Sequence, residues 1–263
     1  MSVQFLWRWI PLAFLLILCW GAEKLLAQDP FEIQLYDYET LEAGKTQVEL
    51  HSNFVARGPR QPPPTGLRDT DQALRLTWEF IHGVKKNYEV AAYLVTFRHG
   101  HGDGYQVAEV RLRHRVSFPK SWGLPVDVSL NNEYSFNRRS FEPNSVTMEI
   151  RPILQKDIDR WTFWFEPILE KALRGPDAHR GFALDPSAKV AFALTPKVKP
   201  GLEYYSALGL ITRMDPLRRQ GHILMPAVDL FFHKRLEINL GIGFGLTSAS
   251  ERVILKSIVG VTF

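Results

Sequence analysis

The stretch Leu236-Glu-Ile-Asn-Leu-Gly-Ile-Gly-Phe-Gly-Leu246 alternates between an apolar residue and a polar residue or glycine along its whole length. Six apolar side chains fall on one parity, and three glycines fall on the other together with Glu237 and Asn239. A period of two is the spacing of a β-strand, because successive side chains of a strand point to opposite faces. This stretch therefore predicts a long strand with one apolar face and one polar face.

The same alternation recurs along the chain, as in Val126–Asn137 and Leu74–Ile81. We predict strands over residues 46–56, 73–83, 87–98, 105–117, 126–138, 144–155, 160–173, 187–197, 202–213, 222–232, 236–246 and 252–263. Each is long enough to cross a bilayer as a tilted strand. Long and short connections largely alternate, with the third, fifth and eleventh as exceptions. The predicted fold is an all-β, transmembrane, antiparallel up-and-down β-barrel of about 12 strands that occupies residues 45–263.

The N-terminus has the features of a secretory signal peptide over residues 1–27. Arg8 precedes the apolar run Trp9–Trp20, and Ala27 stands at a plausible cleavage position. The run is too short for a spanning helix. The only cysteine, Cys19, lies in this segment, so the mature chain is expected to be exported and free of cysteine. The lipoprotein alternative is weaker, because a leucine precedes Cys19 where a small residue is needed.

Residues 28–44 form a separate segment ahead of the barrel. Phe31–Leu41 also alternates and would make a thirteenth strand if it were counted. Because bacterial outer-membrane barrels have an even number of strands, we predict a periplasmic N-terminal segment that covers or enters the inner mouth.

The C-terminus ends on Phe263, with Val261 and Val259 at alternating positions before it. This pattern resembles the membrane-insertion signal that the barrel-insertion machinery reads. The alternative fold is a soluble secreted β-sandwich whose last strand is apolar. Together with the signal peptide, the pattern favours the bacterial outer membrane as the location.

The composition excludes other classes of protein. The chain is 45% hydrophobic, which argues against a disordered chain, and it has too few cysteines for a disulfide scaffold. A formal charge of +4 over 263 residues is too weak to indicate nucleic acid as a partner.

The face opposite the apolar one is unusually charged. Candidates for the lumen or its constriction are Arg111, Arg113, Arg115, Asp127, Glu133, Glu149 and Arg151. Further charges predicted to face inward are Glu49, Arg75, Glu79, Glu89, Glu109, Glu166, Glu170, Lys189, Glu203, Arg213, Asp229, Glu237 and Lys256. An arginine facing mid-bilayer lipid costs about 2–4 kcal/mol, so this many charges require a polar interior.

Two functions fit such an interior. The first is a passive channel for small solutes, with the arginine row and facing carboxylates as its constriction. The second is a plugged structural or binding barrel that recognises a partner through outer loops 57–72 and 174–186, since mutually satisfied ion pairs can fill the lumen. Twelve strands give a backbone diameter of roughly 24 Å, and long side chains consume most of it.

The sequence gives little support for a catalytic site or a metal site. The loop His99-Gly-His101-Gly-Asp103 offers three metal-ligand types, but its spacing matches no closed site, and a solvated outer loop is the preferred interpretation. His51 and Ser52 are adjacent and point to opposite faces, so they cannot form a nucleophile–base pair. We predict no enzyme activity, no metal and no cofactor.

Several stretches together resemble a known family. They are Glu32–Tyr36, Glu49–Phe54, Ser121–Asp127, Val146–Pro152, Ala172–Pro176 and Gly201–Tyr205. They are similar to uncharacterised bacterial outer-membrane barrels related to the "meta-pathway of phenol degradation" transporter-like proteins. The resemblance implies a porin-like transport barrel of a Gram-negative bacterium for small, hydrophobic or aromatic solutes. The expected partners are outer-membrane lipid, the insertion machinery and the solute, and the chain is expected to be a monomer.

Overall fold

The computed structural model describes residues 33–60, 66–100 and 104–263, so the predicted signal peptide 1–27 lies outside the described residues. Strands in chain order are β1 (Thr46–Arg57), β2 (Ala73–Lys85), β3 (Tyr88–His99), β4 (Gln106–Ser117), β5 (Asp127–Asn137), β6 (Val146–Ile158), β7 (Trp161–Glu166), β8 (Leu169–Arg174), β9 (Ala183–Leu184), β10 (Ser187–Phe192), β11 (Val198–Ala207), β12 (Gly209–Leu210), β13 (Arg213–Met214), β14 (Gly221–His233), β15 (Leu236–Gly245) and β16 (Val253–Thr262). Two 3-10 turns cover Lys120–Trp122 and Leu217–Arg219. Within the described residues, no helix is long and apolar enough to cross a membrane.

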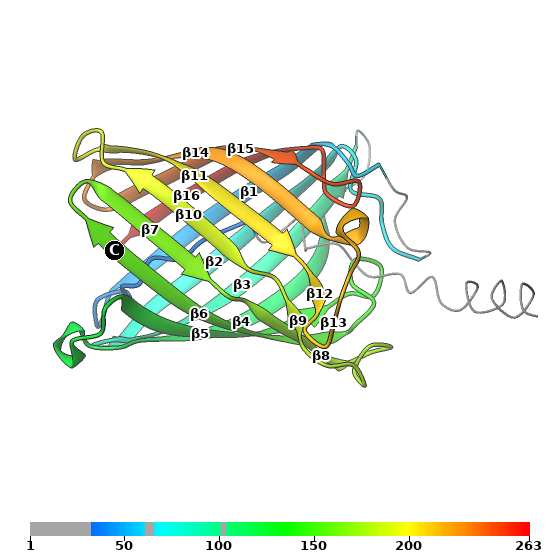
Figure 1. Ribbon diagram of the computed structural model, residues 1–263, viewed down its shortest axis with the longest axis horizontal. Coiled ribbons are helices and arrows are strands. Elements are labelled where there is room, and N and C mark those ends of the chain that lie inside the picture. The colour runs from blue at the N-terminus through cyan, green and yellow to red at the C-terminus, as the bar shows by residue number, and fades with distance from the viewer. Residues whose placement is uncertain (1–32, 61–65, 101–103) are drawn as a thin grey trace, which may run out of the picture.

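These strands form one closed antiparallel barrel of twelve crossings (Figure 1). Three crossings are interrupted, so that β7 and β8, β9 and β10, and β11 and β12 each make up one wall segment. Closure is made by β1, which pairs with β2 on one side and with β16 on the other. The amide of Phe263 donates to the carbonyl of Thr46 over 2.8 Å, so the last residue completes the seam. The predicted fold class is confirmed.

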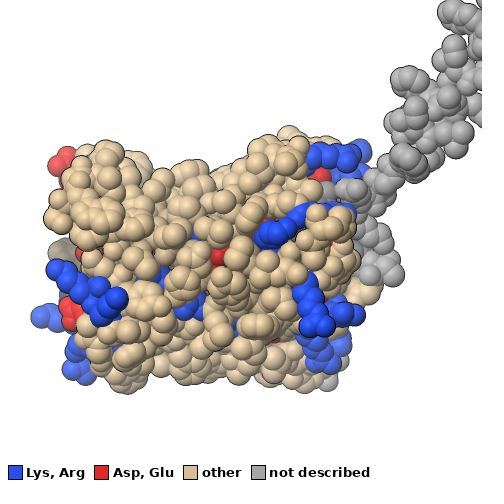
Figure 2. Space-filling model, turned by 90° about the horizontal axis from the view of Figure 1, so that it is seen from below, with Lys and Arg blue, Asp and Glu red and all other residues tan. Residues whose placement is uncertain are grey.

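The wall has the expected two faces. Along β2, buried residues alternate with half-exposed or exposed ones from Ala73 to Val84. The outward side chains are apolar and open to the surroundings: Phe80 is 50% exposed, Leu112 50% and Phe244 48%. Figure 2 shows that, on one side of the barrel, most lysines and arginines gather toward the two ends. The exterior is therefore an apolar belt between two charged rims.

The connections separate into two rims. At the rim that contains the C-terminus, β2–β3, β6–β7 and β14–β15 are each joined by two residues. At the opposite rim, the connections include 58–72, 175–182 and 246–252. We call these the short-turn rim and the long-loop rim.

Two predicted strands are displaced because prolines shift the turns. The strand predicted over 187–197 ends at Phe192, and the turn predicted at 198–201 occupies 193–197, which contains Pro196. The strand predicted over 202–213 accordingly begins at Val198. Arg213, predicted to face inward, instead lies exposed in the short strand β13 on the long-loop rim.

The β1–β16 seam can be tested by a cross-link. Ser52 and Ser257 are direct cross-strand partners in the seam. Their Cα atoms should be about 4.5–5.5 Å apart, which is within the range of a disulfide. In a chain expressed without residues 1–27, the pair Ser52→Cys and Ser257→Cys should therefore oxidise spontaneously, giving faster migration on a denaturing, non-reducing gel. The control pair Ser52→Cys and Val259→Cys is two residues out of register and should stay reduced. Equal oxidation of both pairs would contradict this register.

Candidate functional site

The interior of the barrel is lined by charged side chains on alternate residues of neighbouring strands. On β4, Arg111, Arg113 and Arg115 are all buried and point inward, while Leu112 points outward. The adjacent strands β3 and β5, and β2 beyond β3, supply glutamates at Glu89, Glu133 and Glu79, each at most 1% exposed. Because the wall is closed, these charges are held away from bulk water and need partners inside the barrel.

Each of the three arginines is paired with carboxylates. Arg113 Nη2 lies 2.9 Å from Glu79 Oε1 and 2.8 Å from Glu89 Oε1. Arg115 shares Glu89 at 2.9 Å. Arg111 bridges Glu109 at 2.6 Å and Glu133 at 2.8 Å. The row therefore carries a shared network and not three separate charges.

The other predicted lumen residues divide into three groups. Arg151 joins Glu149 at 2.6 Å and Glu166 at 3.3 Å, which extends the network along β6 and β7. On the opposite wall, Lys189 pairs with Asp229 at 2.7 Å, and the Lys256 ammonium contacts the Glu203 carboxylate. Asp127 lies apart from these, because it pairs with Lys120 beside the short-turn rim.

Tyr205 also lies inside the lumen. Its place near a strand end in the sequence is typical of an interfacial aromatic girdle, but the side chain is 1% exposed inside the lumen. Its hydroxyl donates to Glu203 Oε2 over 2.8 Å. The alternation of the strand could have predicted this position. Tyr205 lies two residues after the inward Glu203, so both side chains are on the same face of the strand.

The N-terminal segment runs lengthwise through the lumen. Ile33 packs in an apolar cluster with Val55, Ile223 and Ile254, which lie at the long-loop ends of their strands. At the other end, the Leu41 amide donates to Glu89 Oε2 over 2.6 Å near the start of β3. Residues 33–41 thus fill the short-turn half of the barrel and reach into the other half. The expectation that the segment enters the barrel agrees with these contacts.

A cavity of about 300 Å³ opens above this filling, toward the long-loop rim. Its lining includes Arg75, Arg111, Arg151, Glu109 and Glu133, and Phe97 and Phe141 with other apolar side chains complete it. Arg113 and Arg115 do not line it. We call this space the vestibule.

The loops that border the vestibule are linked through Glu251. The hydroxyl of Thr70, in loop 58–72, donates to the carboxylate of Glu251, in loop 246–252. Arg252 Nε also donates to the carbonyl of Gly58 over 2.8 Å. Burial raises the pKa of Glu251 to about 7, with Asp69 and Asp71 adding to the shift.

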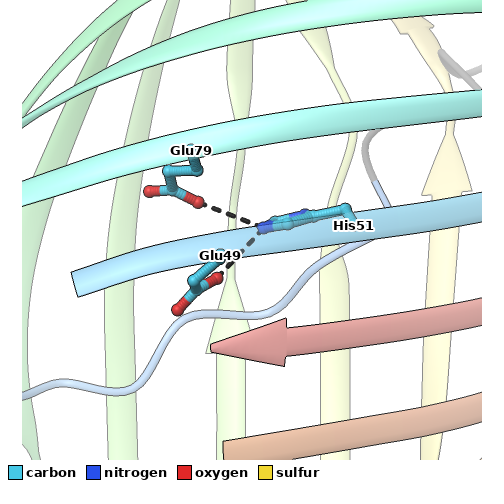
Figure 3. A group of neighbouring side chains, drawn as sticks. All are labelled: Glu49, His51 and Glu79. Carbon is cyan, nitrogen blue, oxygen red and sulfur yellow. Dashed lines mark hydrogen bonds and ion pairs between the residues drawn. The ribbon is translucent and has the colours of Figure 1, made fainter. Parts of the chain in front are cut away.

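One group in the described residues has the composition of a metal site. Glu49, His51 and Glu79 are buried, and their ligand atoms lie within 4.8 Å of one another. Figure 3 shows both carboxylates directed at the imidazole, with Nε2 at 3.0 Å from Glu49 and 3.2 Å from Glu79. Two carboxylates and one imidazole can hold a divalent cation. They equally form an ion-pair cluster around a protonated histidine. The positive charge of Arg113, which pairs with Glu79, disfavours a divalent cation beside it.

Of the loop residues with metal-ligand types, His101 and Asp103 lie outside the described residues. The ring of His99 stacks on Phe97 with centroids 6.5 Å apart, at the end of β3.

Removing the central guanidinium should destabilise the barrel. Arg113→Met leaves Glu79 buried with fewer cationic partners, and breaking such a pair costs about 3–5 kcal/mol. Adding Glu79→Gln to this variant removes the orphaned charge and should recover part of the loss. Urea unfolding in lipid vesicles, followed by tryptophan fluorescence, measures both variants. A loss below about 1 kcal/mol for Arg113→Met would show that the pair is not desolvated.

Loop packing at Glu251 should weaken as the pH rises. The folded pKa, about 7, exceeds the ordinary value of 4.5, so the folded state retains a proton that the unfolded loops release. The resulting stability is complete below pH 4.5, falls between pH 4.5 and 7, and is gone above that. Amide exchange over 66–72 and 246–252, corrected for its intrinsic pH dependence, should be roughly tenfold faster at pH 8 than at pH 5. Glu251→Gln should show no such change, and an unchanged wild-type rate would contradict the shift.

The fold is similar to the folds of several solved outer-membrane proteins. The chain is similar to an outer-membrane channel from Pseudomonas putida F1, with a TM-score of 0.62, 10% identity, and coverage of 88% of this chain and 100% of that one. It is also similar to the NanC porin (TM-score 0.54, 9% identity, 82% and 98% covered) and the KdgM porin (TM-score 0.51, 8% identity, 82% and 99% covered).

No family model and no curated protein matches the sequence. At these identities the likeness concerns the fold alone. The specific resemblance to the phenol-degradation family is therefore not confirmed, whereas the barrel architecture of outer-membrane channels is shared by this chain.

Proposed function

We propose that this protein is a non-catalytic outer-membrane channel for small solutes in a Gram-negative bacterium. The observation that carries the proposal is the vestibule, a cavity of about 300 Å³ lined by paired charges inside a closed barrel with an apolar exterior. A soluble β-sandwich buries its apolar side chains between two sheets. This barrel does the reverse, because it encloses its charges and exposes its apolar face.

The exterior supports a place in lipid. Trp78, Phe80, Leu112, Ile242 and Phe244 each expose 41–50% of their surface on the outward parity. An apolar band of this kind between charged rims is what a membrane barrel presents to hydrocarbon. The similar solved structures are themselves described as an outer-membrane channel and porins. Phe263, Val261 and Val259 remain the proposed insertion signal, and the chain needs no second copy to close its wall.

The solute would first meet the vestibule. Arg75, Arg111 and Arg151 lie in its wall among Glu109 and Glu133, so the surface carries both signs of charge. Phe97 and Phe141, with ring centroids 4.9 Å apart, add an aromatic patch. Such a surface suits small solutes that combine an aromatic or hydrophobic part with a charged group. This agrees with the resemblance to the phenol-degradation barrels, which we retain as part of the proposal.

The constriction is the part of the path below the vestibule. Arg113 and Arg115 lie there, but the lumen beside them is taken by residues 33–41. In the proposed mechanism, this segment closes the path, and solute passes when the segment shifts or leaves.

A plugged binding barrel is the second candidate function, and the same segment favours it. In that case the long loops at 57–72 and 174–186 recognise a partner and nothing passes through the wall. The two candidates differ in whether removal of the segment opens a pore.

Planar-bilayer recordings test the channel. Replacing residues 33–41 with a flexible Gly/Ser sequence of equal length should raise single-channel conductance several-fold over wild type, because the wall-bound segment is lost. Adding Arg111→Glu to this variant should shift its ion selectivity toward cations. The variant Glu42→Ala, which keeps residues 33–41 and truncates an exposed side chain of the following turn, is the control and should conduct like wild type. Absence of conductance in all of these proteins would reject the channel and favour the plugged barrel.

A further inference from the structure

The lumen binds the backbone of residues 33–41 as well as their side chains. Carbonyl and carboxylate oxygens of the wall accept from three segment amides: Glu166 from Tyr36 at 2.7 Å, Gln155 from Tyr38 at 2.9 Å, and Glu89 from Leu41 at 2.6 Å. All three partners are side chains of the wall. The segment therefore lies outside the sheet, although it is extended.

Wall arginines bind the carbonyls of the same segment. Arg151 donates to the carbonyl of Gln34 over 3.2 Å. Arg115 donates to the carbonyls of Asp37 and Glu39, each over 3.0 Å. The wall thus forms hydrogen bonds with both the amides and the carbonyls of an extended peptide. Other binding sites for extended peptides use main-chain hydrogen bonds in the same way.

One side chain of the segment has a pocket of its own. The ring of Tyr36 lies 4.9 Å from the guanidinium carbons of Arg113 and Arg151 and 5.3 Å from that of Arg115. Its hydroxyl lies 2.9 Å from the Tyr93 hydroxyl and 3.3 Å from Glu133. Cation–π contacts strengthen when they are desolvated, so this pocket selects an aromatic side chain with a hydroxyl.

The segment is joined to the wall by a turn and not by continuous strand. Residues 42–45 are exposed, and Gly44 has a φ of +80°, which favours glycine. The Gly44 amide donates to the carbonyl of Gly83 over 2.7 Å, which anchors this turn to the end of β2. The lumen contacts and the covalent link to the wall are therefore made by separate parts of the chain.

We propose that the lumen is a binding site for an extended, tyrosine-containing peptide, and that residues 33–41 are its resident ligand. The proposal rests on the proposed function only in its consequence, namely that bound peptide closes the channel. Peptides of this class should therefore compete with residues 33–41 for the lumen. When bound there, they should block the channel.

The test uses the complete folded protein, so folding without the segment is never required. A protease recognition sequence is inserted between Ala43 and Gly44 and is cut after the protein has folded. We expect the released N-terminal piece to stay bound through dilution and gel filtration. With Tyr36→Ala, the piece should dissociate on the order of tenfold faster, because its ring and hydroxyl contacts are lost. Glu42→Ala, which truncates an exposed side chain of the same piece, is the control and should dissociate at the wild-type rate.

Rebinding gives the second readout. The barrel is emptied by letting the cut Tyr36→Ala piece dissociate. It is then titrated with a fluorescent synthetic peptide of residues 33–41, and with the same peptide carrying Tyr36→Ala or the reversed sequence. Saturable binding of the first peptide only, with block of the conductance, supports the proposal. The proposal is overturned if the wild-type and variant N-terminal pieces all dissociate at the same rate. It is also overturned if all three peptides bind equally well. A cut, emptied barrel that conducts but binds no peptide refutes this site alone, whereas peptide binding without conductance refutes only the channel.

Discussion

The pairing of buried charges inside a closed wall is the constraint on which the rest of this structure depends. Arg113 has no exposed side-chain surface, and it is shared between Glu79 and Glu89, which come from two other strands. A buried ion pair adds little net stability, but it penalises strongly any arrangement that separates its partners. A register slip of one residue would move the charges of a strand to the apolar exterior. The network therefore specifies which strands are neighbours and in what register they pair.

The same network explains why the lumen contains peptide. A barrel of twelve strands leaves room along its axis for more than side chains, and a carboxylate such as Glu166 can accept further hydrogen bonds beside its ion pair with Arg151. The amides of residues 36, 38 and 41 occupy those oxygens, while Arg115 and Arg151 satisfy carbonyls of the same segment. The segment is thus the part of the network that a wall built from alternating side chains cannot supply for itself.

Sequence periodicity predicted the parts of this architecture that depend on parity. The inward arginines of β4 and the glutamates opposite them follow directly from a period of two. The prediction was wrong at Arg213 and at the strands around Pro196, because prolines and irregular connections shift the parity without a periodic signal. The course of residues 33–41 could be expected to meet the barrel mouth, but its partners could not be predicted. Glu166, Gln155 and Glu89 are far from the segment in sequence, and only the closed three-dimensional wall brings them to it.

The division of the arginine row has a functional consequence. Arg111 faces the vestibule, whereas Arg113 and Arg115 hold Tyr36 between them and Arg151. The three arginines of β4 therefore have two different environments, because residues 33–41 cover only part of the row. The open part of the wall can act on a solute, and the covered part acts on the chain's own peptide. In the proposed function, channel and plugged barrel are two occupancies of one wall, and the interaction of Tyr36 with the three guanidinium groups favours the plugged one.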